Sequence, residues 1–144
     1  MFKKFFKKTE IDNNNNNKDV LIAALLIHAA KIDQMYTDDE KNIIKKALMD
    51  LSKINLSEAE KILELAEKKE EESNQIVEFT REIKKKPMEF RLKIIETIWK
   101  IVYSDNTNDN YESNLIRRIC GLLYVSDKDN GIIKTKVQNL KDKS

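Results

Sequence analysis

Turn-forming residues are scarce in this chain of 144 residues, which contains two glycines and one proline. Sandwiches and barrels need many such residues at their turns, so an all-β architecture is a poor fit. The single cysteine, Cys120, excludes an internal disulfide framework and fits a reducing compartment. It lies in an apolar helical stretch, where we expect a small buried residue rather than a reactive thiol.

A large excess of charge of one sign is also missing. The chain has 27 Lys and Arg against 25 Asp and Glu, for a net charge of +2, and the two signs are interleaved. A nucleic-acid partner needs a gathered basic surface, so we expect none. The stretch at residues 20–30 is apolar apart from His28, and it is about half the length that spans a bilayer. The N-terminus lacks the pattern of a secretory signal, and we expect a cytoplasmic protein, or one held peripherally at the inner membrane face.

Helix-forming stretches rich in Glu and Lys make up most of the chain, and charged residues account for 36% of it. This composition predicts an all-α domain with solvated outer faces. We expect helices at residues 19–32, 37–53, 57–72, 74–86, 87–104, 109–124 and 127–141. Two of the helical hairpins have the same design, so the predicted fold is a bundle of roughly seven helices with two pseudo-two-fold-related hairpins.

Local signals mark several helix ends and faces. Asp19 is a candidate N-cap for the first helix, and Ser57 followed by Glu60 has the spacing of a capping box. The Ser126–Asp129 segment predicts a similar start for the last helix. Two apolar faces are expected: Ile62, Leu65 and Ala66 in one helix, and Ile76, Phe79, Thr80 and Ile83 in the next.

Residues 1–18 differ from the rest and are expected to form an arm outside the domain at 19–144. Phe2, Phe5 and Phe6 alternate with lysine pairs, and a run of five asparagines, 13–17, follows as a linker. Three alternatives stay open for this arm: a helix that packs its Phe side chains back on the domain, disorder, or weak contact of residues 1–8 with an anionic membrane surface.

One sequence pattern occurs twice. Residues 33–46 return as residues 105–118, a shift of 72 positions (105 minus 33). In each copy an apolar helix ends at an Asp, a polar corner follows, and a Glu stands seven residues after the Asp. We call residues 33–40 the first corner and residues 105–112 the second corner. Two copies predict a duplicated hairpin rather than a solenoid.

The acids of these corners have two interpretations. As helix caps, Thr37 with Glu40 and Asp109 with Glu112 each form a capping box. As ligands, their oxygens could converge on Ca²⁺ or Mg²⁺, which prefer carboxylates. The candidate metal ligands are, in the first corner, Asp33, Asp38, Asp39 and Glu40, and in the second, Asp105, Asp109 and Glu112. Neither corner matches an EF-hand loop. His28, the only histidine, aligns with Lys100 in the second copy, which predicts a partly exposed side chain and not a metal ligand.

The doubled corners, the stretch Ile98–Asp105 and the segment Phe79–Arg81 before Pro87 together resemble the TerB family of tellurite-resistance-associated proteins over roughly residues 19–140. The resemblance implies an all-helical fold, acidic corners proposed to bind divalent cations, and a stress-linked role in bacteria. A similar domain accompanies a membrane-anchored J-domain co-chaperone, which implies an interaction module. This chain lacks the His-Pro-Asp tripeptide of a J-domain, so co-chaperone activity does not carry over.

The corners depart from the family pattern where the family has glycine after the Asp. This chain has Gln34 in the first corner and Asn106 in the second. Asn adopts the left-handed conformation more readily than Gln does, so the second corner is the better candidate for a cation site.

We therefore expect a non-enzymatic domain that responds to a divalent cation or binds a protein partner. A peripheral membrane adaptor anchored through residues 1–8 is the alternative. An enzyme that uses paired carboxylates, such as a metal-dependent hydrolase, is the third hypothesis. It is disfavoured because no phosphate-binding glycine loop, Cys/His cluster or nucleophile motif is present.

Overall fold

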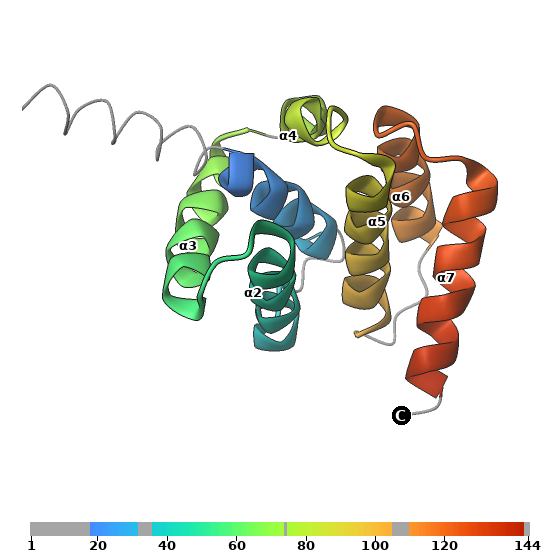
Figure 1. The fold of residues 1–144 in the computed structure, drawn as a ribbon, viewed down its shortest axis with the longest axis horizontal. Coiled ribbons are helices and arrows are strands. Elements are labelled where there is room, and N and C mark those ends of the chain that lie inside the picture. Colours follow the sequence, from blue (N-terminus) through green and yellow to red (C-terminus); the bar gives the residue numbers. More distant parts are fainter. Residues whose placement is uncertain (1–17, 32–35, 74, 105–109, 143–144) are drawn as a thin grey trace, which may run out of the picture.

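The computed structural model describes residues 18–31, 36–73, 75–104 and 110–142, and every regular element in these ranges is a helix (Figure 1). The predicted all-α class is therefore confirmed. The helices are residues 18–30, α2 (Asp38–Ser52), α3 (Leu56–Glu72), α4 (Ile76–Ile83), α5 (Met88–Tyr103), α6 (Asn110–Leu122) and α7 (Asp127–Asp142). They agree with the seven predicted ranges except at their ends. The largest difference is in α4, which stops at Ile83 rather than at residue 86.

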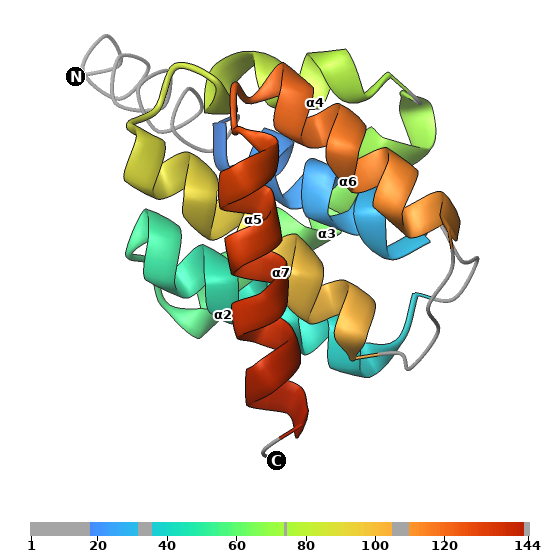
Figure 2. The same ribbon diagram turned by 90° about the vertical axis from the view of Figure 1, so that its right-hand side faces the viewer.

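The helices form two groups joined through α5 (Figure 1). On one side α2 packs against α3, and on the other α5 packs against α6 and α7. Contacts between α2 and α5 connect the two groups, and α4 covers one end and touches α6. Figure 2, turned by 90°, shows α7 lying across α5.

The helix at residues 18–30 is the centre of the core. Six consecutive residues, from Ile22 to Ile27, are at most 2% exposed. A helix that is apolar on all sides must be surrounded by other elements, so the remaining helices cover it. Trp99, which aligns with Ile27 in the repeat, is likewise buried, at 3% exposure.

Two contacts show that the duplicated hairpins are built alike. The hydroxyl of Ser52, at the end of α2, donates to the Asp19 carboxylate over 2.7 Å. In the second copy the Arg91 guanidinium, near the start of α5, donates to the carbonyl of Leu123 over 2.8 Å. Each contact ties the start of one helix to the end of the next, so both pairs run antiparallel.

Three local predictions were wrong. Asn55, not Ser57, is the N-cap of α3, because its side chain accepts from the Glu58 amide over 2.8 Å. Asp19 lies inside its helix, where its carboxylate binds Ser52. Leu65 is 51% exposed, since the buried face of α3 carries Ala59, Ile62, Leu63, Ala66 and Glu70 instead.

Other local predictions were confirmed. The four residues predicted as the apolar face of α4, Ile76, Phe79, Thr80 and Ile83, are all buried. Ser126 accepts from the Asp129 amide at the start of α7, as the cap prediction requires. Cys120 is buried, and burial raises the pKa of its thiol to about 12. Within the described ranges, no helix is both long and apolar enough to cross a membrane.

Candidate functional site

The structure places only part of the predicted cation ligands. Asp33, Asp105 and Asp109 lie outside the described residues, and Glu112 lies in the first turn of α6 with its side chain not described. Asp39 and Glu40 are in the first turn of α2, where Asp39 is exposed and Glu40 is only 2% exposed. The second corner therefore stays a prediction, and the first can be examined in part.

The capping box of the first corner is present as predicted. The Glu40 carboxylate accepts from the Thr37 amide over 2.8 Å and from the Thr37 hydroxyl over 3.1 Å, both at Oε1. In return, the Glu40 amide donates to Thr37 Oγ1 over 3.2 Å. Glu40 thus has a structural role in starting α2, and its Oε1 is committed to the Thr37 donors.

A buried ion cluster lies beside the first corner. Glu70, on the inner face of α3, is 6% exposed. Its Oε2 accepts from Lys31 Nζ over 2.9 Å, and its Oε1 lies 3.3 Å from His28 Nδ1. The His28 side chain is 24% exposed, which confirms the prediction that it is partly exposed. The cluster joins the end of the first helix to α3, just before the residues that lead into the corner.

Tyr36 extends this contact to the start of α2. Its hydroxyl donates to Glu67 Oε1 over 3.3 Å, and the Lys41 ammonium lies 4.9 Å from its ring centroid. Burial raises the pKa of the Tyr36 hydroxyl well above its usual value, and the nearby Glu67 carboxylate raises it further. The neutral phenol therefore remains a donor, and α3 is bonded both to the end of the first helix and, through Tyr36, to the first corner.

Sequence reasoning missed Glu70, Lys31 and Glu67 because their partners are 31 to 42 residues away along the chain. One signal was available for Glu70. It lies four residues after Ala66 and eleven after Ala59, on the same helical face as these two small residues. A charged residue in that register predicts a buried carboxylate that needs partners.

The second corner joins α5 to α6. The described part of α5 ends at Tyr103 and α6 begins at Asn110, so residues 104–109 connect them and carry Asp105 and Asp109. The Lys141 ammonium at the end of α7 donates to the carbonyl of Tyr103. A cation at the carboxyl end of a helix stabilises its exposed carbonyls, so α7 helps to fix the helix that leads into this corner.

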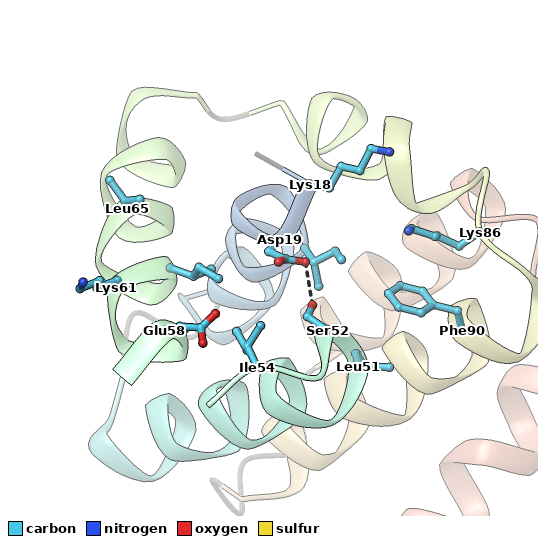
Figure 3. A pocket seen from close by; sticks show the side chains of 12 residues that line it. Lys18, Asp19, Leu51, Ser52, Ile54, Glu58, Lys61, Leu65, Lys86 and Phe90 are labelled. Atoms are coloured by element: carbon cyan, nitrogen blue, oxygen red, sulfur yellow. Dashed lines mark hydrogen bonds between the residues drawn. The ribbon is translucent and has the colours of Figure 1, made fainter. Parts of the chain in front are cut away.

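A cavity of about 730 Å³ lies between the first helix, α2, α3 and the start of α5. Figure 3 shows Asp19 and Ser52 in its middle, with Leu65 and Lys61 of α3 on one side and Lys86 and Phe90 on the other. Its apolar lining consists of Ile22, Leu51, Ile54, Ile62, Leu65 and Phe90. We call it the N-terminal cavity, because the first described residue, Lys18, also lines it.

Burial raises the pKa of the Asp19 carboxyl above its ordinary value of 3.8. The Ser52 hydrogen bond and the Lys86 charge lower this pKa, and the nearby Glu58 charge raises it, but each has a smaller effect than burial. The folded state therefore binds the proton more readily than the unfolded chain. The stability of the wild type relative to Asp19→Asn should increase as pH falls through the raised pKa, and level off below 3.8. Urea unfolding of both proteins between neutral and acidic pH measures this, and a difference that is constant with pH would exclude it.

No three His, Cys, Asp or Glu side chains gather in a way that could hold a metal ion among the residues the structure describes. The described residues form an all-helical domain with two like hairpins, whose connecting segments are rich in acids in the sequence. The family model described as "Tellurite resistance protein TerB" matches residues 19–135, so the chain belongs to the TerB family. Searches of curated proteins and of solved structures find no match to the chain.

Proposed function

We propose that this TerB domain is a non-enzymatic interaction module that binds a divalent cation at its second corner, through Asp105, Asp109 and Glu112. The observation that carries the proposal is the contrast between two corners of one duplicated design. The second corner has an acid at position 109 where the first has Thr37. In the first corner, Thr37 instead takes part in the capping box that holds Glu40.

The placement of the helix ends supports a site of this kind. Two Asp residues fall in the connection of six residues between α5 and α6, and Glu112 follows in the first turn of α6. Three carboxylates within one short corner suit Ca²⁺ or Mg²⁺, whose ligands are oxygens. The competing explanation is that Asp109 and Glu112 only cap α6, as Thr37 and Glu40 cap α2.

Support for the interaction role comes from the end of the second hairpin that lies away from the second corner. Met88 is 41% exposed and Tyr124 is 68% exposed. The bond from Arg91 to the Leu123 carbonyl brings the start of α5 next to the end of α6, so these two side chains belong to one end of the hairpin. Tyr and Met are enriched at protein interfaces, and we propose that a protein partner binds at this end.

Calorimetric titration with Ca²⁺ and with Mg²⁺ tests the cation half. The wild type should release or absorb binding heat that saturates at one ion per chain, and Asp105→Asn/Glu112→Gln should lose it. Asp38→Asn/Asp39→Asn, two exposed acids in the first turn of α2, is the matched control and should keep it. Equal heats for both double variants, or no heat from the wild type at millimolar ion, would overturn the cation site and leave the interaction role alone.

A further inference from the structure

We propose that the N-terminal arm folds back on its own domain and docks in the N-terminal cavity, with Phe2, Phe5 and Phe6 against the apolar lining. The proposal is independent of cation binding, since the cavity lies between the first helix, α2, α3 and α5 and includes no residue of the second corner.

The path of the chain favours this occupant. Lys18 lines the cavity, so the 17 preceding residues of the sequence are joined to the domain at the edge of the cavity. The asparagine run at 13–17 can span up to about 17 Å when extended. A helix with its side chains is about 10–12 Å across, so this linker is long enough for the arm to turn back over the neighbouring helix. A segment tethered at the rim also has a high effective concentration there.

One face of the arm and part of the cavity lining are apolar. Phe2, Phe5 and Phe6 have the spacing of one helical face, with lysines on the other. Five of the six apolar lining residues come from the first helix, α2, α3 and α5, and the sixth, Ile54, lies between α2 and α3. One of them, Leu65, is 51% exposed. Leu65 was predicted to be buried in α3, but its side chain points away from the core. A docked Phe side chain would give it an apolar neighbour. A volume of about 730 Å³ is within the usual range for sites that bind apolar groups.

The cavity lining carries two acids, Asp19 and Glu58, and three lysines, Lys18, Lys61 and Lys86, so it offers the basic arm only a local acidic contact. Glu58 acts on Asp19 as a like charge. The Asp19 carboxylate accepts one hydrogen bond, from Ser52, among the residues described. The arm has four lysines near its Phe residues, 3, 4, 7 and 8, and one of these could approach the acids. Lys61 and Lys86, on either side of Asp19 in Figure 3, repel the other arm lysines, which keeps the lysine face towards solvent.

Paramagnetic broadening in the full chain tests the docking. A nitroxide is attached at Thr9→Cys, and methyl signals are recorded for residues of the cavity and of α7. Cys120 is buried, and the chain without Cys at position 9 is treated in parallel to show that Cys120 takes no label. We expect most of the intensity to be lost at Ile22, Ile54 and Ile62, while Ile133 and Val137 in α7 keep theirs.

Two matched substitutions separate docking from chance proximity. Leu65→Lys places a charge on the cavity wall, and Ile132→Lys places one on α7 at a site of similar exposure, 51% against 58%. The broadening should disappear with Leu65→Lys or with Phe2→Ser/Phe5→Ser/Phe6→Ser, and should persist with Ile132→Lys. Both single sites are half-exposed helix positions, where Lys is well tolerated, so loss of the fold does not confuse the comparison.

Three results would overturn the proposal. The first is broadening that is absent, or equal in the cavity and in α7. The second is broadening in a mixture where the nitroxide and the isotope label are on different molecules, which would mean that the arm docks on a second copy. The third is an arm that leaves the cavity signals unchanged and binds only to phosphatidylserine vesicles, which would favour the membrane adaptor.

Discussion

Phe79→Ala should lower the free energy of unfolding by about 3–5 kcal/mol, the usual cost of removing a buried phenyl ring. Phe79 is fully buried in α4, and its ring centroid lies 6.2 Å from that of His28 in the first helix. Because α4 is short, its attachment to the core depends on the few buried side chains of one face. Urea denaturation should show a lower midpoint with an unchanged slope.

Val77→Ala is the control for this change. Val77 is in the same helix but is 48% exposed, and its replacement should alter stability by no more than about 0.5 kcal/mol. Equal effects of the two substitutions would mean that the face of α4 assigned to the core is the wrong one.

Lys31→Met should cost about 1–3 kcal/mol, because it leaves the Glu70 carboxylate buried with a weakened set of partners. The Glu70 side chain is 8% exposed, whereas that of Lys31 is 31% exposed and can be solvated when its partner is removed. Glu70→Met should therefore cost less than Lys31→Met. The double variant should be more stable than Lys31→Met alone, since replacing both members of a buried ion pair by apolar groups is often neutral.

These three variants and the wild type form a double-mutant cycle, and thermal or urea unfolding of each gives its free energy of unfolding. Lys93→Met, which removes the exposed partner of Glu89, is the control and should change stability by at most about 0.5 kcal/mol. If the Lys31→Met and Glu70→Met effects simply add, the Glu70 cluster does not act as a coupled buried pair.

The parts of the fold that sequence predicts well are those decided within one helix. The face from Ile76 to Ile83 and the Thr37–Glu40 capping box both depend on residues three or four positions apart, and both were confirmed. The α3 cap shows the limit of such signals. Asn55 and Ser57 are both good N-caps. The chain uses Asn55, two residues after Lys53 ends α2 in the left-handed conformation.

The parts that sequence did not predict depend on contacts between distant residues. Asp19 looks like a cap until α2 brings Ser52 to it, 33 residues later in the chain. In the sequence, Glu70 is one of many acids in a charged helix. Its role depends on His28 and Lys31, which the fold brings into contact with it. Leu65 looks like a core residue unless the face that packs against the first helix is known. Each of these residues has ordinary neighbours in sequence and takes its role from packing.

The duplicated corners have different surroundings in the two copies. Around the first, the Thr37–Glu40 box, the Tyr36–Glu67 bond and the Glu70 cluster give Thr37, Glu40 and Tyr36 structural contacts, while Asp38 and Asp39 are exposed. Next to the second, α7 supplies Lys141 to the end of α5. Divergence after duplication would explain the difference at the aligned positions 37 and 109, where the first corner has a capping Thr and the second an Asp.

Whether the second corner binds a cation is tested most directly by a crystal structure grown with Ca²⁺. We expect an ion with oxygen ligands from Asp105, Asp109 and Glu112 at about 2.3–2.6 Å. The Thr37–Glu40 capping box should remain intact in the same crystal. The proposal would be contradicted by a second corner that holds no ion and in which the Glu112 carboxylate accepts from the Asp109 amide, as the Glu40 carboxylate accepts from the Thr37 amide. Both corners would then be helix caps.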